Sequence, residues 1–190
     1  TGILTPFQSH SPLFLYVSIN RNRTGRSPLL FLPVLFVWRY LFCLSGITRH
    51  LPTIFPNSGR PVQKAVLDIG CTCPNIDGTI SSGGCLFCDG GSGHFTHPGT
   101  VARQLEQERQ RIRASVPDAG LIAYFQAHTN TYGNLAYLRR CYLEALEQPD
   151  VVGISIGTRP DCLPAEILSL LEEIAEKTSL TVELGLTNSA

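Results

Sequence analysis

From residue 60 onward, short apolar runs alternate with segments in which apolar residues recur every three or four positions. An apolar run of this length is typical of a buried strand, and the wider spacing is typical of a helix with one face on a core. The expected strands cover residues 64–69, 121–125, 151–156 and 180–186. The expected helices cover residues 101–114, 134–148 and 164–177.

Strands and helices therefore alternate along residues 60–190, with short connections between them. This order predicts βαβ units, a parallel sheet and an α/β fold class. The pattern ends on a strand that no helix follows. We therefore expect the front part of a (β/α) barrel, a partial TIM-like barrel truncated after about four strands. In such barrels the reacting groups lie at the carboxyl ends of the strands.

Residues 1–59 differ from the rest of the chain in composition and in their pattern of apolar positions. Residues 1–28 are rich in Ser, Thr, Asn, Arg and Pro, which predicts a flexible segment. The apolar run over residues 29–38 is interrupted by Pro33 and ended by Arg39. It is about half of the roughly 20 apolar residues that span a bilayer, so we expect no membrane contact. We expect residues 1–59 to be a largely irregular leader and residues 60–190 to be the barrel domain.

Composition excludes several classes of protein. Apolar residues make up 43% of the chain, as in a globular domain. Lys+Arg and Asp+Glu balance at 15 each, so no general nucleic-acid or membrane footprint is expected. The seven cysteines are odd in number and unevenly spread, unlike a secreted disulfide framework. This usage indicates a reducing compartment, the cytoplasm.

The candidate chemistry lies in a Gly-rich loop after the first expected strand. Cys73, Cys85 and Cys88 are gathered there. Grouped thiolates bind zinc or iron–sulfur clusters. Three protein ligands instead of four leave one metal position open, and an open position is where metal chemistry takes place.

Spacing alone permits zinc. Cys85-Leu-Phe-Cys88 is a common zinc half-site, and Cys73 with Cys71, His94 or His97 would complete a tetrahedron. The chain would then be a zinc-clipped α/β binding module. Two features count against zinc: the gap before Cys85 is longer than in a compact zinc knuckle, and the loop sits where a barrel places its chemistry.

Four blocks of sequence resemble the radical S-adenosylmethionine (radical SAM) superfamily, and more closely its bacterial subgroup related to the elongator catalytic subunit. That subgroup lengthens the first gap of the usual CxxxCxxC motif, as this chain does. The blocks cover residues 68–88, 124–132, 152–164 and 182–186. The resemblance spans about residues 60–187.

The resemblance implies a [4Fe–4S] cluster held by Cys73, Cys85 and Cys88, with SAM bound to the remaining iron. Hydrogen bonds and burial around such thiolates set the cluster's reduction potential. The family pattern requires no cysteine at position 71, so Cys71 is interpreted as a bystander. His94 and His97 are interpreted as surface or capping residues.

The segment expected to contact SAM departs from the family pattern. Many radical SAM proteins carry a Gly-Gly-Glu-like segment after the second strand, where this chain has Gln-Ala-His-Thr-Asn over residues 126–130. A buried carboxylate such as Glu183 needs a partner, so a polar cavity is expected beside it. Arg159 and Asp161 bind SAM or substrate, or else pair with each other. The candidate SAM-binding residues are Phe87, Gln126, Asn130, Arg159 and Glu183.

The resemblance therefore implies an enzyme that cleaves SAM reductively to a 5′-deoxyadenosyl radical, which abstracts hydrogen from a substrate. An electron donor such as a flavodoxin or ferredoxin is implied as a partner. The elongator relationship raises tRNA as a substrate, but no basic run supports it. The chain has Thr187 where relatives usually carry Gln, so an inactive fragment of the enzyme is a further alternative to the zinc module.

Overall fold

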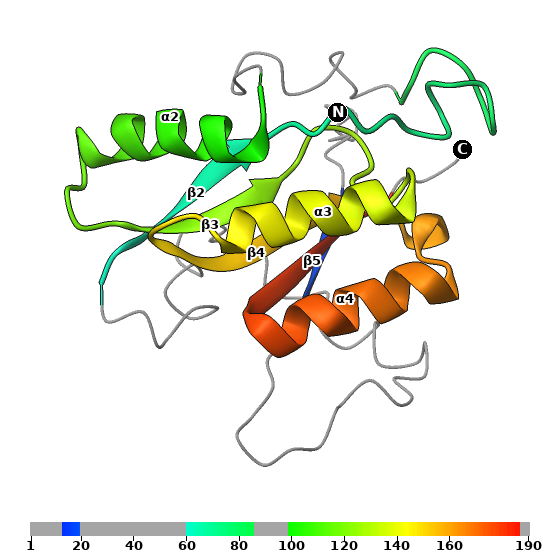
Figure 1. Ribbon diagram of the computed structural model, residues 1–190. Helices are drawn as coiled ribbons and strands as arrows, with labels where there is room; N and C mark the ends of the chain where they lie inside the picture. The colour runs from blue at the N-terminus through cyan, green and yellow to red at the C-terminus, as the bar shows by residue number, and fades with distance from the viewer. Residues whose placement is uncertain (1–12, 20–59, 86–98, 187–190) are drawn as a thin grey trace, which may run out of the picture.

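The structure is a computed structural model that describes residues 13–19, 60–85 and 99–186 (Figure 1). Five strands and three α-helices lie in this part of the chain. The strands are β1 (Leu13–Ile19), β2 (Val62–Leu67), β3 (Gly120–Phe125), β4 (Val151–Thr158) and β5 (Ser179–Leu186). The helices are α2 (Val101–Arg113), α3 (Leu135–Leu146) and α4 (Ala165–Lys177), with a short 3₁₀ turn, η3 (Pro160–Cys162), before α4.

The strands form a single sheet in the order β1-β5-β4-β3-β2. Neighbouring pairs from β2 to β5 are parallel, and β1 runs antiparallel to β5. The predicted α/β class and the four-stranded parallel sheet are therefore confirmed. Strand, helix and strand follow one another in both sequence and space, as βαβ units require.

All three helices cover the same face of the sheet (Figure 1). Leu67, Phe125 and Ile156 belong to the buried core between these helices and the strands. Tyr142 packs its ring edge-on to Phe125, with the ring centroids 5.0 Å apart. Burial of these apolar side chains supplies the main driving force for the fold.

The other face of the sheet carries the alternate residue of each strand, because side chains in a strand point to opposite faces in turn. Polar residues on this face include one from each of four neighbouring strands: Lys64, Tyr124, Ser155 and Glu183. The two faces thus differ in chemistry. One is an apolar core, and the other holds a polar group at its centre.

The helix starts follow local sequence signals. The Thr100 hydroxyl accepts a hydrogen bond from the Arg103 N–H, and the Asn134 side chain accepts one from the Tyr137 N–H. Both residues cap their helices in the manner typical of Thr and Asn. The observed helices lie within a residue or two of the predicted ranges. The first parallel strand, Val62–Leu67, begins two residues before the predicted start at Lys64.

One strand lies inside the segment that we expected to be flexible. Residues 13–19, Leu-Phe-Leu-Tyr-Val-Ser-Ile, form β1 and pair with β5 along their whole length, from Leu13 opposite Leu186 to Ile19 opposite Leu180. The expectation for residues 1–28 was wrong here because it rested on their mean composition. Aromatic and β-branched residues are concentrated in this one run, and they favour strands.

No helix among the described residues is both long enough and apolar enough to cross a lipid bilayer.

Candidate functional site

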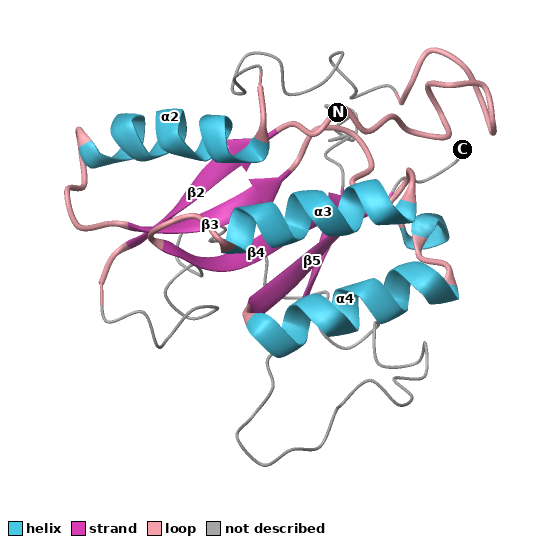
Figure 2. Ribbon diagram, viewed as in Figure 1, coloured by secondary structure: helices cyan, strands magenta, loops and turns pink. Residues whose placement is uncertain are grey.

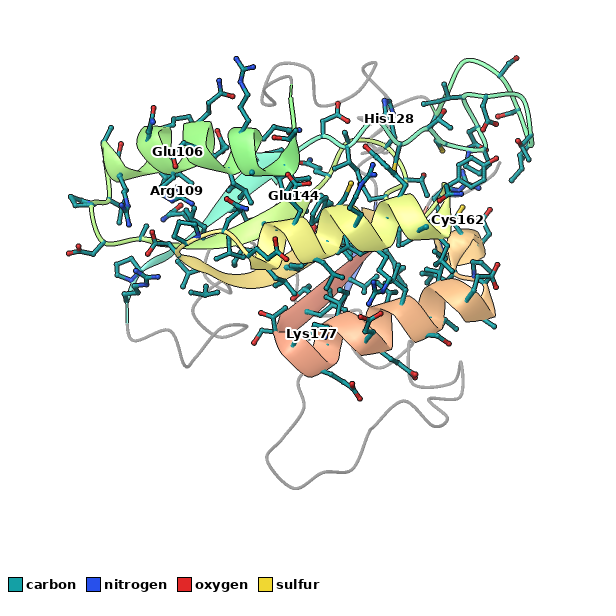
Figure 3. All side chains as sticks on the ribbon, in the orientation of Figure 1. Glu106, Arg109, His128, Glu144, Cys162 and Lys177 are labelled. Atoms are coloured by element: carbon teal, nitrogen blue, oxygen red, sulfur yellow. The ribbon has the colours of Figure 1, made fainter. Side chains whose placement is uncertain are left out.

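Three connections meet at the carboxyl end of the parallel strands (Figure 2). They follow β2, β3 and β4, and we call them together the carboxyl rim: residues 68–85, 126–134 and 159–164. Cys162 and His128 lie at this end of the molecule, whereas Glu106 and Arg109 lie at the other end (Figure 3). The rim is where a parallel sheet gathers functional groups from different strands.

The loop that follows Cys73 folds back on itself. The Cys73 carbonyl accepts hydrogen bonds from the N–H groups of Ile76 (2.8 Å) and Asp77 (3.1 Å), which form a tight turn. The Asn75 carbonyl then accepts the Gly84 N–H at 2.8 Å. Residues that are nine positions apart in sequence are therefore brought together, and Cys85 lies beside the start of the loop.

Two consecutive glycines make this return possible. Gly83 and Gly84 both adopt positive φ angles, +89° and +81°. Residues with a Cβ rarely adopt this backbone conformation, whereas glycine adopts it readily. The Gly-Gly pair in front of Cys85 is therefore required by the backbone path.

Asn75 also contacts the sulfur of Cys85. Its side-chain amide donates a hydrogen bond to the Cys85 Sγ at 3.1 Å. Asn75 thus makes one hydrogen bond to Gly84 through its backbone carbonyl and one to Cys85 through its side chain. Asn75 was not among the predicted site residues, because its spacing from Cys73 does not indicate that it reaches Cys85.

Cys73 lies against the connection that follows β4. Its side chain is 8% exposed, and the Arg159 Nη1 is 4.0 Å from its sulfur. Arg159 is held by Asp161 in a two-bond contact, Nε to Oδ1 at 2.9 Å and Nη2 to Oδ2 at 2.6 Å. Of the two roles considered for this pair, the ion pair is present, and it leaves one nitrogen of Arg159 directed at Cys73.

Arg159 and Asp161 stabilise each other's charged form. The hydrogen bond to Asp161 raises the pKa of Arg159, and the same contact lowers the pKa of Asp161. Burial, and then the charge of Asp161, raises the pKa of the neighbouring Cys162 thiol to about 11. Arg159 is therefore a permanent cation next to Cys73, and Cys162 is a protonated thiol.

Cys71 belongs to the core and not to the site. It is packed among the buried apolar residues under the helices. Burial, and then the charges of Cys141 and Asp68, raises the pKa of its thiol to about 12. The placement of Cys71 among core side chains agrees with its interpretation as a bystander.

The second rim segment contains Gln126 and Asn130. Gln126 is exposed at the end of β3, and Asn130 is fully buried. The Asn130 amide donates to the carbonyls of Phe125 (3.0 Å) and Gly157 (3.1 Å), which ties the ends of β3 and β4 together. Its Oδ1 accepts no hydrogen bond within the described part of the chain. Only that one atom of Asn130 remains for a ligand.

Glu183 is at the centre of the polar face and is 4% exposed. Its carboxylate accepts hydrogen bonds from Lys64 Nζ (2.5 Å), Ser155 Oγ (2.6 Å) and Tyr124 Oη (2.8 Å). We expected a polar cavity beside this carboxylate, and the structure instead gives it these three donors. Sequence analysis missed Lys64, Tyr124 and Ser155, which stand out as polar residues at alternate positions of apolar strands.

A cavity of about 490 Å³ opens at the carboxyl rim. Its walls come from residues 73–85, which we call the cysteine loop (Pro74, Ile80), from the segment after β3 (Thr131, Tyr132) and from the region of η3 (Asp161). The Tyr132 hydroxyl and the Thr79 hydroxyl are hydrogen-bonded across it at 3.0 Å. The cavity therefore joins the cysteine loop to the other two rim segments.

Several predicted site residues lie outside the described residues: Phe87, Cys88, His94 and His97. Among the residues that the structure does describe, no three His, Cys, Asp or Glu side chains gather in a way that would hold a metal ion. The proposed ligand set contains Cys88, so this observation covers only two of its three members.

The chain is similar to several curated proteins. It is 47% identical over 131 residues to the "Uncharacterized protein YtqA" of Bacillus subtilis, covering 67% of this chain and 41% of that protein. Identity to "Protein YhcC" of Escherichia coli is 38% over the same shares. For the "Uncharacterized protein MJ0486" of Methanocaldococcus jannaschii it is 30% over 156 residues, 77% of this chain and 44% of that protein.

The chain thus spans about two fifths of the length of these relatives, from 41% to 44%. No family model matches the chain. No solved structure matches it either.

Proposed function

We propose that this chain is the N-terminal part of a radical SAM enzyme. In this proposal Cys73, Cys85 and Cys88 hold a [4Fe–4S] cluster, SAM binds the iron that has no protein ligand, and the sheet is the first part of a TIM-like barrel. The proposal combines the four-block resemblance of residues 60–187 with the arrangement at the carboxyl rim.

One observation carries the proposal. The loop between Cys73 and Cys85 folds back through the Asn75–Gly84 hydrogen bond, at the carboxyl edge of a parallel sheet. A structural zinc clip has no need of this edge, whereas a cofactor that reacts with a substrate does. The fold-back thus supports a reactive centre and not a clip.

The described residues fit an iron–sulfur cluster in their chemistry. Iron–sulfur clusters are held by Cys thiolates and are tuned by hydrogen bonds to sulfur and by burial. Both described candidate ligands have a nitrogen donor directed at the sulfur, from Asn75 for Cys85 and from Arg159 for Cys73. Such outer partners orient metal ligands and stabilise their negative charge.

When bound, the cluster and SAM supply a one-electron cleavage that yields a carbon-centred radical for hydrogen abstraction. The protein's task is to position the cofactors and exclude competing reactions. Arg159, fixed by Asp161, supplies a permanent positive charge beside Cys73 for the carboxylate of SAM. Gln126 offers an exposed amide on the next segment of the rim.

The other candidate SAM contacts are more restricted. Asn130 retains its Oδ1 as an acceptor, and Glu183 is already held by Lys64, Ser155 and Tyr124. We propose that Glu183 shapes the inner, polar face of the barrel and that Arg159 and Gln126 make the direct contacts. A flavodoxin or ferredoxin would supply the electron.

The barrel proposal has a structural requirement at its open edge. A barrel continues from β5 through a further parallel strand, and β1 lies antiparallel along that edge. In a longer chain that completes the barrel, the next parallel strand takes this edge of β5, so β1 can no longer pair with β5 there. Unpaired strand edges invite association, so β1 here covers an edge that would otherwise be open.

Addition of SAM to the reduced, cluster-loaded protein tests the function. We expect SAM to change the electron paramagnetic resonance spectrum of the cluster, because its amino and carboxylate groups bind the free iron. We also expect 5′-deoxyadenosine and methionine to be released in equal amounts. An unchanged spectrum and no release, with the cluster present, would contradict a radical SAM function.

A further inference from the structure

Asn75 connects the start of the cysteine loop to residues 81, 84 and 85. Its carbonyl accepts the Gly84 N–H at 2.8 Å and the Ser81 hydroxyl at 3.4 Å. Its side-chain amide donates to the Cys85 Sγ at 3.1 Å. The residue therefore has two separable roles: its backbone closes the loop, and its side chain contacts sulfur.

The side-chain contact has an electrostatic consequence. An amide N–H presents the positive end of its dipole, and a thiolate that binds iron carries negative charge. A donor fixed at 3.1 Å stabilises additional electron density on that sulfur. It does so more strongly for the reduced state of a cluster, which carries one more negative charge than the oxidised state.

The nitrogen donor at Cys73, from Arg159, is farther from its sulfur than Asn75 is from the sulfur of Cys85. Arg159 Nη1 is 4.0 Å from the Cys73 Sγ, and two of its other nitrogens are already bound to Asp161. Arg159 also stands next to the place proposed for SAM, so its replacement would change two properties at once. Asn75 is the cleaner probe of hydrogen bonding to sulfur.

We propose that Asn75 is a positioning residue that orients Cys85 and raises the reduction potential of the cluster. This inference rests on the proposed function, because it requires a cluster at Cys73, Cys85 and Cys88. Reduction takes one electron from an external donor, a flavodoxin or ferredoxin in the cell, and forms no new covalent bond. The Asn75 N–H makes that electron easier to accept.

The experiment is a redox titration of the cluster in the full chain, with dithionite as reductant and paramagnetic resonance as readout. Asn75→Ala removes the amide and keeps the backbone carbonyl that closes the loop. We expect about a tenfold lower ratio of reduced to oxidised cluster at a fixed potential, which is a shift of about 59 mV to a more negative midpoint for one electron.

Two further variants complete the test. Ser81→Ala removes a contact to the same Asn75 carbonyl and touches no sulfur, so its midpoint is expected to match the wild type. Asn75→Asp keeps the side-chain size and loses the donor, so it is expected to shift the midpoint in the same direction as Asn75→Ala. It also serves if the alanine variant fails to fold, as judged by circular dichroism.

The possible results distinguish a failure of the role of Asn75 from a failure of the proposed radical SAM function. A wild-type protein that holds the cluster, together with Asn75 variants whose midpoints match those of the wild type and Ser81→Ala, overturns the role of Asn75 and leaves the proposed function intact. A wild-type protein that assembles no cluster overturns both.

Discussion

Lys64→Met is expected to lower the free energy of unfolding by about 3 kcal/mol at neutral pH. The Glu183 side chain is 4% exposed and pairs with Lys64 at 2.5 Å. Without Lys64, a buried carboxylate keeps, among the residues that the structure describes, the hydroxyls of Tyr124 and Ser155 as donors. The value is at the lower end of the range for breaking a buried ion pair, because the Lys64 side chain is 27% exposed. Chemical denaturation measures it directly.

The reason for the loss can be tested with a second change. Glu183→Gln in the Lys64→Met background removes the unpaired charge. Tyr124 and Ser155 bind different oxygens of Glu183, so the Gln oxygen accepts from one of these hydroxyls and the Gln amide donates to the other. We expect this double variant to recover most of the lost stability, to within about 1 kcal/mol of the wild type. If the double variant is no more stable than Lys64→Met alone, the buried charge is not the cause.

A matched lysine provides the control. Lys177 pairs with Glu173 at 4.0 Å on the surface of α4, where the Lys177 side chain is 47% exposed. Exposed pairs of this kind contribute little to stability. Lys177→Met is therefore expected to leave the denaturation midpoint unchanged, which separates the loss of a particular partner from a general effect of removing lysine.

The parallel part of the sheet was predictable because each of its elements carries a local signal. The run Val151-Val-Gly-Ile-Ser-Ile is apolar enough for a buried strand, and β4 begins at Val151. Asn134 announces the start of α3 through its capping side chain. The order of these elements along the chain then determines the parallel arrangement.

The strand β1 was not predicted, for a physical reason. Its partner, β5, lies more than 160 residues away in the sequence. Pairing over such a distance leaves no local mark. The run Leu13–Ile19 carries a strand propensity of its own, but the polar residues around it hid that signal in a composition-based interpretation.

At the site, residue types were easier to predict than their contacts. The pairing of Arg159 with Asp161 was foreseen as one of two options, because the two residues are neighbours in sequence. The contact of Asn75 with Cys85 depends on how a Gly-rich loop closes, and that path is not encoded in spacing. The partners of Glu183 come from three other strands, so only the register of the sheet could identify them.

Removal of any one of the three candidate cysteine ligands is the second change with a large expected effect, the loss of the cluster. Cys73→Ala, Cys85→Ala and Cys88→Ala are each expected to abolish cluster assembly, because a cluster with two protein thiolates is not held. Cys71→Ala is the matched control, since Cys71 is two residues from Cys73 and is packed in the core. It is expected to keep the cluster with a small loss of stability.

The most direct measurement is the iron and acid-labile sulfide content of each chain after oxygen-free assembly, with zinc measured in the same samples. The account predicts one [4Fe–4S] cluster per chain in the wild type and in Cys71→Ala, and none in the three ligand variants. Tightly bound zinc without iron in the wild type, or a full cluster that persists in Cys73→Ala, Cys85→Ala and Cys88→Ala, would contradict it.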